Sequence, residues 1–450
     1  MGSMLVFDAD WFSNTCMSQN NSTNDNQVLS LPVYEHRNSL YEELHTRPSP
    51  SVQSPCYVSH LALLRGQLDV NKEYELLMSL CQRFSVNPPG PEASCFYQSF
   101  GGFEFRWERH TEFSSYTFIR PKDDQKTQEF GLAFIPKDWL NQLPGELVVA
   151  INMLVEDSPH SEPDASHFFE GLKPVGSHVA NGKARVLTGF RLHSDGFGRF
   201  LVENKGLNPY QTGRLIQRLL ELETYRIMAL MGLPVARSLS SEVAQMETEL
   251  ADLIHKIATA GNNGEDKKLL SELSEIAAKV EQYRSDTNYR FSATNAYHAL
   301  VGKRLEQVYE QKISGYQTMR EFLERRLTPG IRTCNSLRDR LEDLSRRIHR
   351  TTSLLRTRVE VSIESQNQKL LASMDRRSSL QLRLQQTVEG LSVVAIGYYL
   401  LSLLGYGFAG MEEWGYPINK TIASGLAMPV VLGLVYWAVR RHIKKLNKKK

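Results

Sequence analysis

Cysteine is scarce in this sequence, and its placement excludes the common metal and disulfide frameworks. The five cysteines are scattered through 450 residues, and no two have C-x-x-C spacing. Paired cysteines or His-paired cysteines at short spacing are needed for a structural zinc site. An odd number of isolated cysteines is typical of a protein in a reducing compartment. We therefore predict neither a disulfide framework nor a zinc site.

The short motifs of familiar cofactor sites are also missing. The sequence holds no P-loop, no dinucleotide-binding glycine fingerprint between a strand and a helix, and no HExxH. The formal net charge is only +3, and much of the excess lies in the terminal tail, so no basic domain of a nucleic-acid-binding kind is present. The N-terminus lacks the basic and apolar regions of a secretory signal. We predict no cofactor, no nucleic-acid partner and a cytoplasmic N-terminal region.

Two stretches near the C-terminus carry no charge at all. They cover residues 390–410 and 421–439, and each has about the 20 residues that an α-helix needs to cross a bilayer. The loop at 411–420 contains acidic residues, whereas the tail at 440–450, RRHIKKLNKKK, is strongly basic. Because cytoplasmic flanks are rich in Lys and Arg, we expect a transmembrane hairpin with a periplasmic loop and both termini in the cytoplasm. The tail would then contact anionic lipid head groups.

The region ahead of the hairpin divides by composition. Residues 1–30 are polar and are expected to be disordered. Residues 31–206 mix strand and helix patterns, which predicts an α+β cytoplasmic domain. The expected strands and helices are, in order: strand 57–64, helix 71–84, strands 103–109, 113–119 and 130–135, helix 138–143, strand 146–154, and a hairpin whose turn is Asn181–Gly182.

From residue 207 the pattern becomes helical. Asn208 is a good N-cap and Pro209 suits the first helical position, so a helix is expected to begin there. Residues 207–330 should form a helical region, with breaks near residue 232 and at residues 329–330. Residues 331–389, which contain neither Pro nor Gly, should form one long stalk helix.

The stalk begins with a coiled-coil-like apolar seam. Apolar residues recur at spacings of three and four at Leu337, Leu341, Leu344, Ile348, Leu355 and Val359. The seam then becomes polar at Ser362, Gln366, Asn367 and Ser373. Such a long helix must pack on others to be stable. The polar part is either a solvated face or the wall of a water-filled channel built from several copies.

Three polar clusters are candidate ligand sites in the cytoplasmic domain. Alternation along a strand places Arg106, Glu108 and His110 on one face, and His with a nearby carboxylate can transfer protons while Arg can hold an anion. The full candidate set is His45, Arg47, Arg106, Glu108, His110, Glu112, His193 and Asp195. Cross-strand salt bridges would use the same residues. The loop at 156–167, rich in carboxylates and His, is either a solvated loop or a sensor of divalent cations.

The first predicted span contains residues with pore-lining potential. Hydroxyl side chains and a glycine interrupt its aliphatic run at Ser392, Tyr398, Tyr399, Ser402, Tyr406 and Gly407. Helix packing within an oligomer explains the central tyrosines equally well, and Tyr406 fits an interfacial belt. Gly390, Gly397 and Gly405 would allow close helix approach. No charged residue lies inside either span, which argues against a proton relay.

Four runs carry a family resemblance. They are ELHTRPSP at 43–50, RWERHTEFSSYTF at 106–118, LNPYQTGRLIQRLLELETYRIMAL at 207–230 and LRLQQTVEGLSVVAIGYYL at 382–400. In these runs the chain resembles the bacterial membrane-anchored family known as domain of unknown function 3422, from about residue 31 onward. The resemblance implies a bacterial inner-membrane protein and no established activity.

A second resemblance is architectural. A cytoplasmic domain, a long helix that continues into the first of two C-terminal spans, a short outer loop and a Lys-rich end are similar to CorA-type magnesium channels. These are homopentamers whose first span lines the pore and ends in Tyr-Gly-Met-Asn. Here the corresponding residues are Tyr406, Gly407, Phe408 and Ala409, so Tyr-Gly is kept and Met-Asn is not. The resemblance thus implies the topology of a channel without its magnesium motif.

These observations lead to two functional hypotheses. The first is an oligomeric CorA-like ion channel or transporter, with divalent cations as candidate ions and a cytoplasmic regulatory domain. The alternative is a non-conducting, membrane-anchored scaffold whose cytoplasmic domain binds a ligand or a protein partner. An enzymatic function would depend on the histidine clusters alone and is not predicted.

Overall fold

A computed structural model describes residues 34–37, 40–41, 49–66, 70–122, 130–157, 165–259, 266–413, 415 and 419–447. The chain forms two compact units. One comprises Met1–Asp252 and Ser274–Ile348, and the other comprises Leu253–Leu273 and His349–Lys450. The first unit is the predicted α+β domain with most of its helices, and the second contains the rest of the stalk and both apolar helices.

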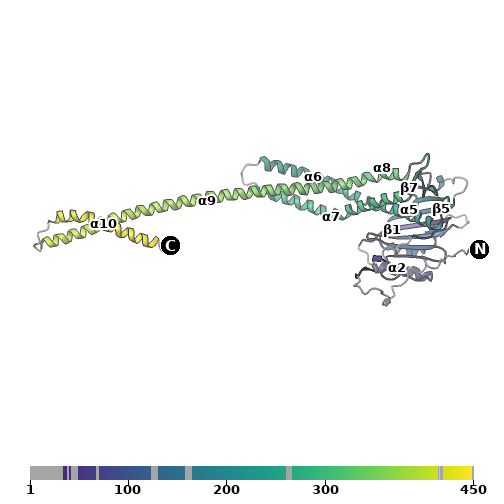
Figure 1. Ribbon diagram of the computed structural model, residues 1–450, viewed down its shortest axis with the longest axis horizontal. Helices are drawn as coiled ribbons and strands as arrows, with labels where there is room; N and C mark the ends of the chain where they lie inside the picture. Colours follow the sequence, from purple (N-terminus) through teal and green to yellow (C-terminus); the bar gives the residue numbers. More distant parts are fainter. Residues whose placement is uncertain are drawn as a thin grey trace, which may run out of the picture. The chain divides into compact units, whose positions relative to one another are not determined.

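The first unit is built on one mixed sheet (Figure 1), whose strand order is β2-β3-β4-β1-β5-β8-β7-β6-β9. All neighbouring strands are antiparallel except β5 and β8, which are parallel. The strands are β1 (Cys56–Leu64), β2 (Cys95–Ser99), β3 (Glu104–Arg109), β4 (Phe113–Pro121), β5 (Glu146–Asp157), β6 (Val175–Val179), β7 (Ala184–Leu192), β8 (Gly198–Asn204) and β9 (Gln311–Lys312).

Both faces of the sheet are covered. The central strands are therefore mostly apolar along their length, instead of alternating between apolar and polar residues. On one face, Val58 and Ala62 of β1 join a core with helix α5 (Pro209–Leu230). On the other face, Leu61 and Leu63 join a core with helix α2 (Val70–Arg83). Successive residues of β1 therefore point to different helices.

Helix α5 begins where its sequence predicts. The side chain of Asn208 accepts a hydrogen bond from Gln211 N at 2.9 Å, and the Gln211 side chain accepts one from Asn208 N at 3.1 Å. This capping box, with Pro209 in the first turn, satisfies amide groups that the helix itself cannot. The cap fixes the start of α5 and so places its next turns over the sheet.

The remaining helices follow in chain order. The short elements are the 3₁₀-helix η2 (Gly131–Phe134), α3 (Lys137–Leu140), α4 (Ala165–Phe168) and α8 (Met319–Arg326). The long ones are α6 (Gly232–Thr259), α7 (Asp266–Gln307), α9 (Thr328–Glu413) and α10 (Lys420–Asn447). Helix α9 is 86 residues long and continues without a break from the predicted stalk into the first apolar stretch.

The second unit contains the ends of α6 and α7, and α9 from residue 349 onward. Arg358 of α9 donates to the Ile257 carbonyl at 2.9 Å and pairs with Asp266 at 3.3 Å. Beyond this anchor α9 is exposed on nearly every side as far as its apolar segment. There α10 turns back alongside it to form a helical hairpin (Figure 1).

Three local predictions were wrong or incomplete. Residues 130–135 form no strand and contain η2 instead, in which Gly131 packs so closely on Phe118 that an added methyl group would lie 3.0 Å from the Phe118 carbonyl oxygen. The break predicted at residues 329–330 lies slightly earlier, at Leu327 between α8 and α9, because Pro329 fits the first turn of α9, where a missing amide hydrogen costs nothing. Strands β2, β8 and β9 were not predicted.

Candidate functional site

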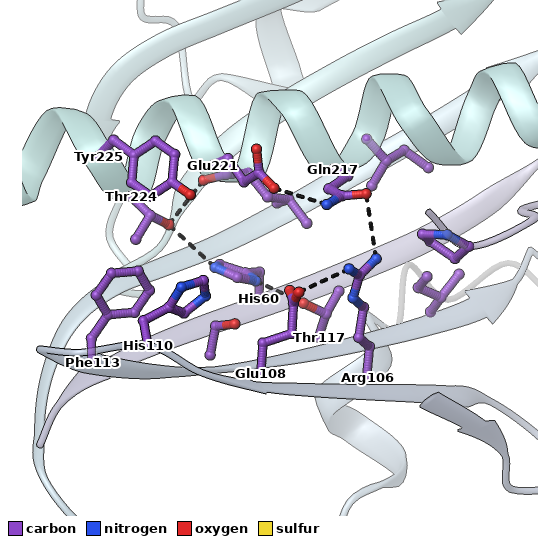
Figure 2. Close-up of a pocket in the computed structure, with 15 residues that line it drawn as sticks. His60, Arg106, Glu108, His110, Phe113, Thr117, Gln217, Glu221, Thr224 and Tyr225 are labelled. Atoms are coloured by element: carbon purple, nitrogen blue, oxygen red, sulfur yellow. Dashed lines mark hydrogen bonds and ion pairs between the residues drawn. The ribbon is translucent and has the colours of Figure 1, made fainter. Parts of the chain in front are cut away.

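A small cavity, lined by both apolar and polar side chains, lies between helix α5 and the sheet (Figure 2). It has a volume of about 30 Å³, enough for a water-sized occupant in the present structure. Strands β1, β3 and β4 supply its floor and α5 its roof. Its polar lining consists of His60, Arg106, Glu108, His110, Ser115, Thr117, Gln217, Glu221, Thr224 and Tyr225.

His60 is held as a neutral imidazole by two threonines. The Thr224 hydroxyl donates to the Leu220 carbonyl at 2.9 Å, so it accepts from His60 Nε2 at 3.3 Å. His60 Nδ1 is then the unprotonated nitrogen and accepts from the Thr117 hydroxyl at 2.8 Å. Burial lowers the pKa of His60 to about 4, although the nearby Glu108 carboxylate acts in the opposite direction. With both nitrogens engaged, His60 links β1 to α5 rather than serving as a general base.

Arg106 connects the sheet to α5 by side-chain contacts (Figure 2). Its guanidinium donates to Glu108 at 2.9 Å and to Gln217 Oε1 at 3.5 Å. Gln217 in turn donates to Glu221 at 2.8 Å, and Glu221 accepts from Arg304 of α7. Arg106 and Glu108 are both buried, so removing either one would leave an uncompensated charge in the interior. An anionic ligand entering this cavity would compete with Glu108 for the guanidinium.

The opposite face of β3 carries a second buried ion pair. Glu73 of α2 accepts from Trp107 Nε1 at 2.9 Å, Arg109 Nε at 3.0 Å and the Tyr116 hydroxyl at 2.8 Å. Burial alone would raise the pKa of Glu73, but these hydrogen bonds and the nearby Ser114 hydroxyl lower it below its usual value. Trp107 and Arg109 thus face away from the cavity, as strand alternation predicts.

Of the other predicted ligand residues, only His110 is among those that line the cavity. His110 stacks on Phe113, with ring centroids 4.3 Å apart, at one end of the cavity. Glu112 instead makes a two-point ion pair with Arg290 of α7, at 2.7 and 3.2 Å. His45 and Arg47 lie outside the described residues.

His193 and Asp195 shape the tight turn between β7 and β8. His193 Nδ1 donates to the Phe197 carbonyl at 3.1 Å, and Asp195 accepts from Phe197 N at 3.0 Å. Arg199 pairs with Asp195 at 3.1 Å and with Glu170 at 2.9 Å. These contacts stabilise a turn, while His193 Nε2 is buried without a hydrogen-bond partner in the structure.

The acidic loop that could have sensed cations is only partly described. Glu156 pairs with Lys122, His167 is exposed on α4, and residues 158–164 lie outside the described residues. Within the described parts of the chain, no three His, Cys, Asp or Glu side chains are grouped as metal ligands would be.

The sequence carries a signal for the cavity in β1 and in α5. His60 is a polar residue in the apolar run of β1, CYVSHLALL. Gln217, Glu221 and Thr224 are spaced by four and three residues, so they form a polar stripe on one face of α5. A polar residue in a buried strand and a polar stripe on the following helix together indicate a buried hydrogen-bond network.

A second candidate site lies on the apolar hairpin. Small residues of α9 face α10: a methyl group added to Gly397 would approach Leu432 Cδ2 to 2.8 Å, and one added to Gly405 would lie 3.8 Å from Ser424 Oγ. Val393 and Leu401, four residues to either side of Gly397, are half-buried on the same face. Such small residues allow apolar helices to approach closely.

The predicted pore-lining residues all lie off this contact face. Ser392, Tyr398, Tyr399, Ser402, Tyr406 and Gly407 are exposed within the hairpin. The Ser392 hydroxyl donates to the Val388 carbonyl at 2.9 Å, and the rings of Tyr398 and Tyr399 meet edge to face at 5.9 Å. The hydroxyl groups of this segment therefore point away from α10.

Comparison with known families gives one match. The family model described as "Protein of unknown function (DUF3422)" matches residues 32–446. The chain belongs to this family. No curated protein and no solved structure matches it. The DUF3422 match includes the α+β domain, α9 and α10, so the cavity and the hairpin both lie inside the family region.

Proposed function

We propose that this DUF3422 protein is a homo-oligomer of the bacterial inner membrane that conducts ions along one face of α9. The apolar part of α9 and α10 would form a transmembrane hairpin with both chain termini in the cytoplasm. The ends of α9 from several copies would surround the conducting path, as in CorA-type channels.

Membrane insertion is supported by the surface of the hairpin. Among the described residues, two helical segments are long and apolar enough to cross a bilayer, in α9 and α10. Their large side chains are exposed, for example Leu391 (73%), Leu403 (69%) and Leu426 (73%). Arg440 and Arg441 lie over the rings of Tyr436 and Trp437, a pairing of basic and aromatic residues that suits a membrane boundary. Lipid would remove this apolar surface from water.

The position of the hydroxyl groups carries the proposal of a conducting path. Ser392, Tyr398, Tyr399, Ser402 and Tyr406 all lie off the α10 contact of α9. A hydroxyl group that faces hydrocarbon without a partner is unfavourable, and so polar side chains in spans face other helices or water. A ring of α9 helices would turn this face toward its axis and leave the aliphatic sides to lipid.

Ion flux into proteoliposomes tests this function. The wild type should pass ions down a gradient, and Tyr399→Phe, which removes one hydroxyl from the proposed path, should change the rate. Tyr436→Phe removes a hydroxyl from the exposed side of α10 and is the matched control. Equal rates for both variants, or no flux of any tested cation or anion, would contradict the proposal.

A second function is favoured by the cavity beneath α5. The buried Arg106–Glu108 pair and the uncharged His60 line the same cavity, in a domain that also has at least three apolar core clusters. A non-conducting, membrane-anchored scaffold could bind a small ligand there, with the water-sized cavity widening on binding. Isothermal titration with small carboxylates and phosphates, using Arg106→Gln as the variant, tests this alternative. Binding that Arg106→Gln abolishes, together with absent ion flux, would favour the scaffold.

A further inference from the structure

Between the anchor at Arg358 and the apolar segment, α9 is exposed on nearly every side. All residues from 363 to 388 are exposed, including Ile363 (47%), Leu370 (63%), Met374 (65%), Leu384 (69%) and Val388 (57%). A single exposed helix of this length is not stabilised by helix propensity alone. Its exposed apolar side chains need a partner.

Five of these side chains, Ile363, Leu370, Met374, Leu384 and Val388, follow a seven-residue repeat, whereas the exposed Leu371, Leu380 and Leu382 lie beside it. One series is Ile363, Leu370, Arg377, Leu384, Leu391 and Tyr398, and the other is Asn367, Met374, Gln381, Val388, Ala395 and Ser402. The two series alternate at spacings of four and three, which are the d and a positions of a coiled coil. From Ile363 onward this seam keeps its register into the hydroxyl-bearing face of the apolar segment, and it is offset by one residue from the earlier apolar seam that ends at Leu355 and Val359.

The charges agree with packing against identical copies. Lys369, Arg376 and Arg383 also recur every seven residues, but at position c, away from the seam. Asp375 and Glu389 occupy position b. In a parallel, in-register assembly each residue meets its own counterparts, so charges are tolerated only off the seam. An Asn at position a, such as Asn367, is a known determinant of register.

Arg377 is the exception, because it lies at position d within the seam. Its counterparts would converge at one level of the stalk, roughly 20 Å before residue 390 at 1.5 Å per residue. The flanking e and g positions at this level are Ser373, Ser378 and Leu380, so a neighbouring helix supplies no carboxylate. The converging guanidinium groups therefore need a counter-charge from solution.

We propose that α9 helices of several copies pack in parallel and in register along the seam from Ile363 to Ser402, and that the converged Arg377 side chains bind a small inorganic oxyanion. Guanidinium groups hold oxyanions such as phosphate by charge-assisted, two-point hydrogen bonds. This proposal rests on the self-assembly in the proposed function. It adds that anions would concentrate at the stalk end of the conducting path.

Disulfide cross-linking of the full-length protein in detergent tests the seam. Leu384→Cys and Met374→Cys place thiols at seam positions, and Leu382→Cys, also exposed, places one at position b as a control. The wild-type chain, with its own cysteines, gives the background. Under mild oxidation both seam variants should form inter-chain dimers and Leu382→Cys should not exceed background. Failure of both seam variants, or equal cross-linking by the control, would overturn the parallel seam.

Phosphate titration tests the anion site. The probe is inorganic phosphate in phospholipid-free detergent, at constant ionic strength, so that lipid head groups do not contribute. The melting temperature of the wild-type oligomer should rise and saturate with phosphate, Arg377→Gln should lose that dependence, and Arg376→Gln, at position c, should keep it. An unsaturable rise, or equal loss in both variants, would overturn the anion site. Neither test requires conduction. If both give the expected result and the protein passes no ions, only the proposed channel is refuted, and the seam and the anion site stand.

Discussion

Gly397 of α9 lies directly against Leu432 of α10, and a methyl group at Gly397 would approach Leu432 Cδ2 to 2.8 Å. The absence of a side chain at this position sets how closely the two apolar helices can approach each other. Gly390, seven residues earlier on the same helix, makes no such contact, because a methyl group added there would have no heavy atom within 4 Å.

The two glycines therefore give a matched pair of variants. Gly397→Leu should destabilise the hairpin by about 1–3 kcal/mol, because a large side chain overpacks a close helix contact. Gly390→Leu should be neutral or slightly stabilising, because Leu favours a helix more than Gly does. Thermal unfolding in detergent measures both. A Gly390→Leu variant as unstable as Gly397→Leu would show that the contact is not specific.

Replacing Glu73 should destabilise the first unit strongly. Glu73→Ala leaves the buried guanidinium of Arg109 without its carboxylate and removes the acceptor for Trp107 and Tyr116, at a cost of about 3–5 kcal/mol. Glu75→Ala, on the exposed side of the same helix, should change stability by less than about 0.5 kcal/mol. Chemical denaturation followed by tryptophan fluorescence compares the two. Similar values for both variants would contradict the buried network.

Burial of His60 should make the first unit sensitive to acid. The folded pKa is about 4, below the usual value of 6.5, so the unfolded state takes up a proton first. Stability should be independent of this group above pH 6.5 and fall as the pH drops from 6.5 toward 4, by about 3 kcal/mol in total. Denaturation at several pH values, with His60→Gln as the variant, measures the effect.

His60→Gln should remove most of this pH dependence whatever its effect on stability at neutral pH. The control is His167→Gln, since His167 is exposed on α4 of the same unit. If His60→Gln retains the full acid sensitivity of the wild type, His60 is not the group responsible.

Two helix glycines should respond in opposite directions to alanine. At Gly213 of α5 an added methyl group would lie 1.8 Å from the Pro50 carbonyl oxygen, so Gly213→Ala should destabilise by about 3 kcal/mol. At Gly302 of α7 the space is open, and Gly302→Ala should stabilise by about 0.5–1 kcal/mol through helix propensity. Melting temperatures give the sign directly. Destabilisation by Gly302→Ala would contradict the open surroundings of that residue.

The elements that could be predicted from sequence are those with strong local signals. The capping box at Asn208 and the turn at Asn181–Gly182 mark their own boundaries, and the absence of Pro and Gly from residues 331–389 predicts the unbroken helix α9. Strand β9 could not be predicted, because its two exposed residues pair with β6 only through contacts distant in sequence. Gly131 begins a 3₁₀-helix for a similar reason, since its neighbour Phe118 lies on another element.

The candidate site was predictable in part. Alternation along β3 correctly separates Arg106 and Glu108 from Trp107 and Arg109. What sequence alone could not provide was the partner across the cavity: Thr224 is 164 positions from His60, and only the packing of α5 on the sheet brings them within 3.3 Å. Proximity in sequence groups Glu112 with this cluster, but its ion pair is with Arg290 of α7.

Chemical modification of a cysteine at Ser402 during current recording tests the conducting path most directly. Ser402 lies at a seam position of α9 within the apolar segment, and Ile422→Cys, on the exposed surface of α10, is the control. In planar bilayers, a membrane-impermeant thiol reagent should suppress the current of Ser402→Cys and leave the wild type and Ile422→Cys unchanged. The absence of current from the wild type, or a Ser402→Cys current that the reagent does not alter, would contradict a path along this face of α9.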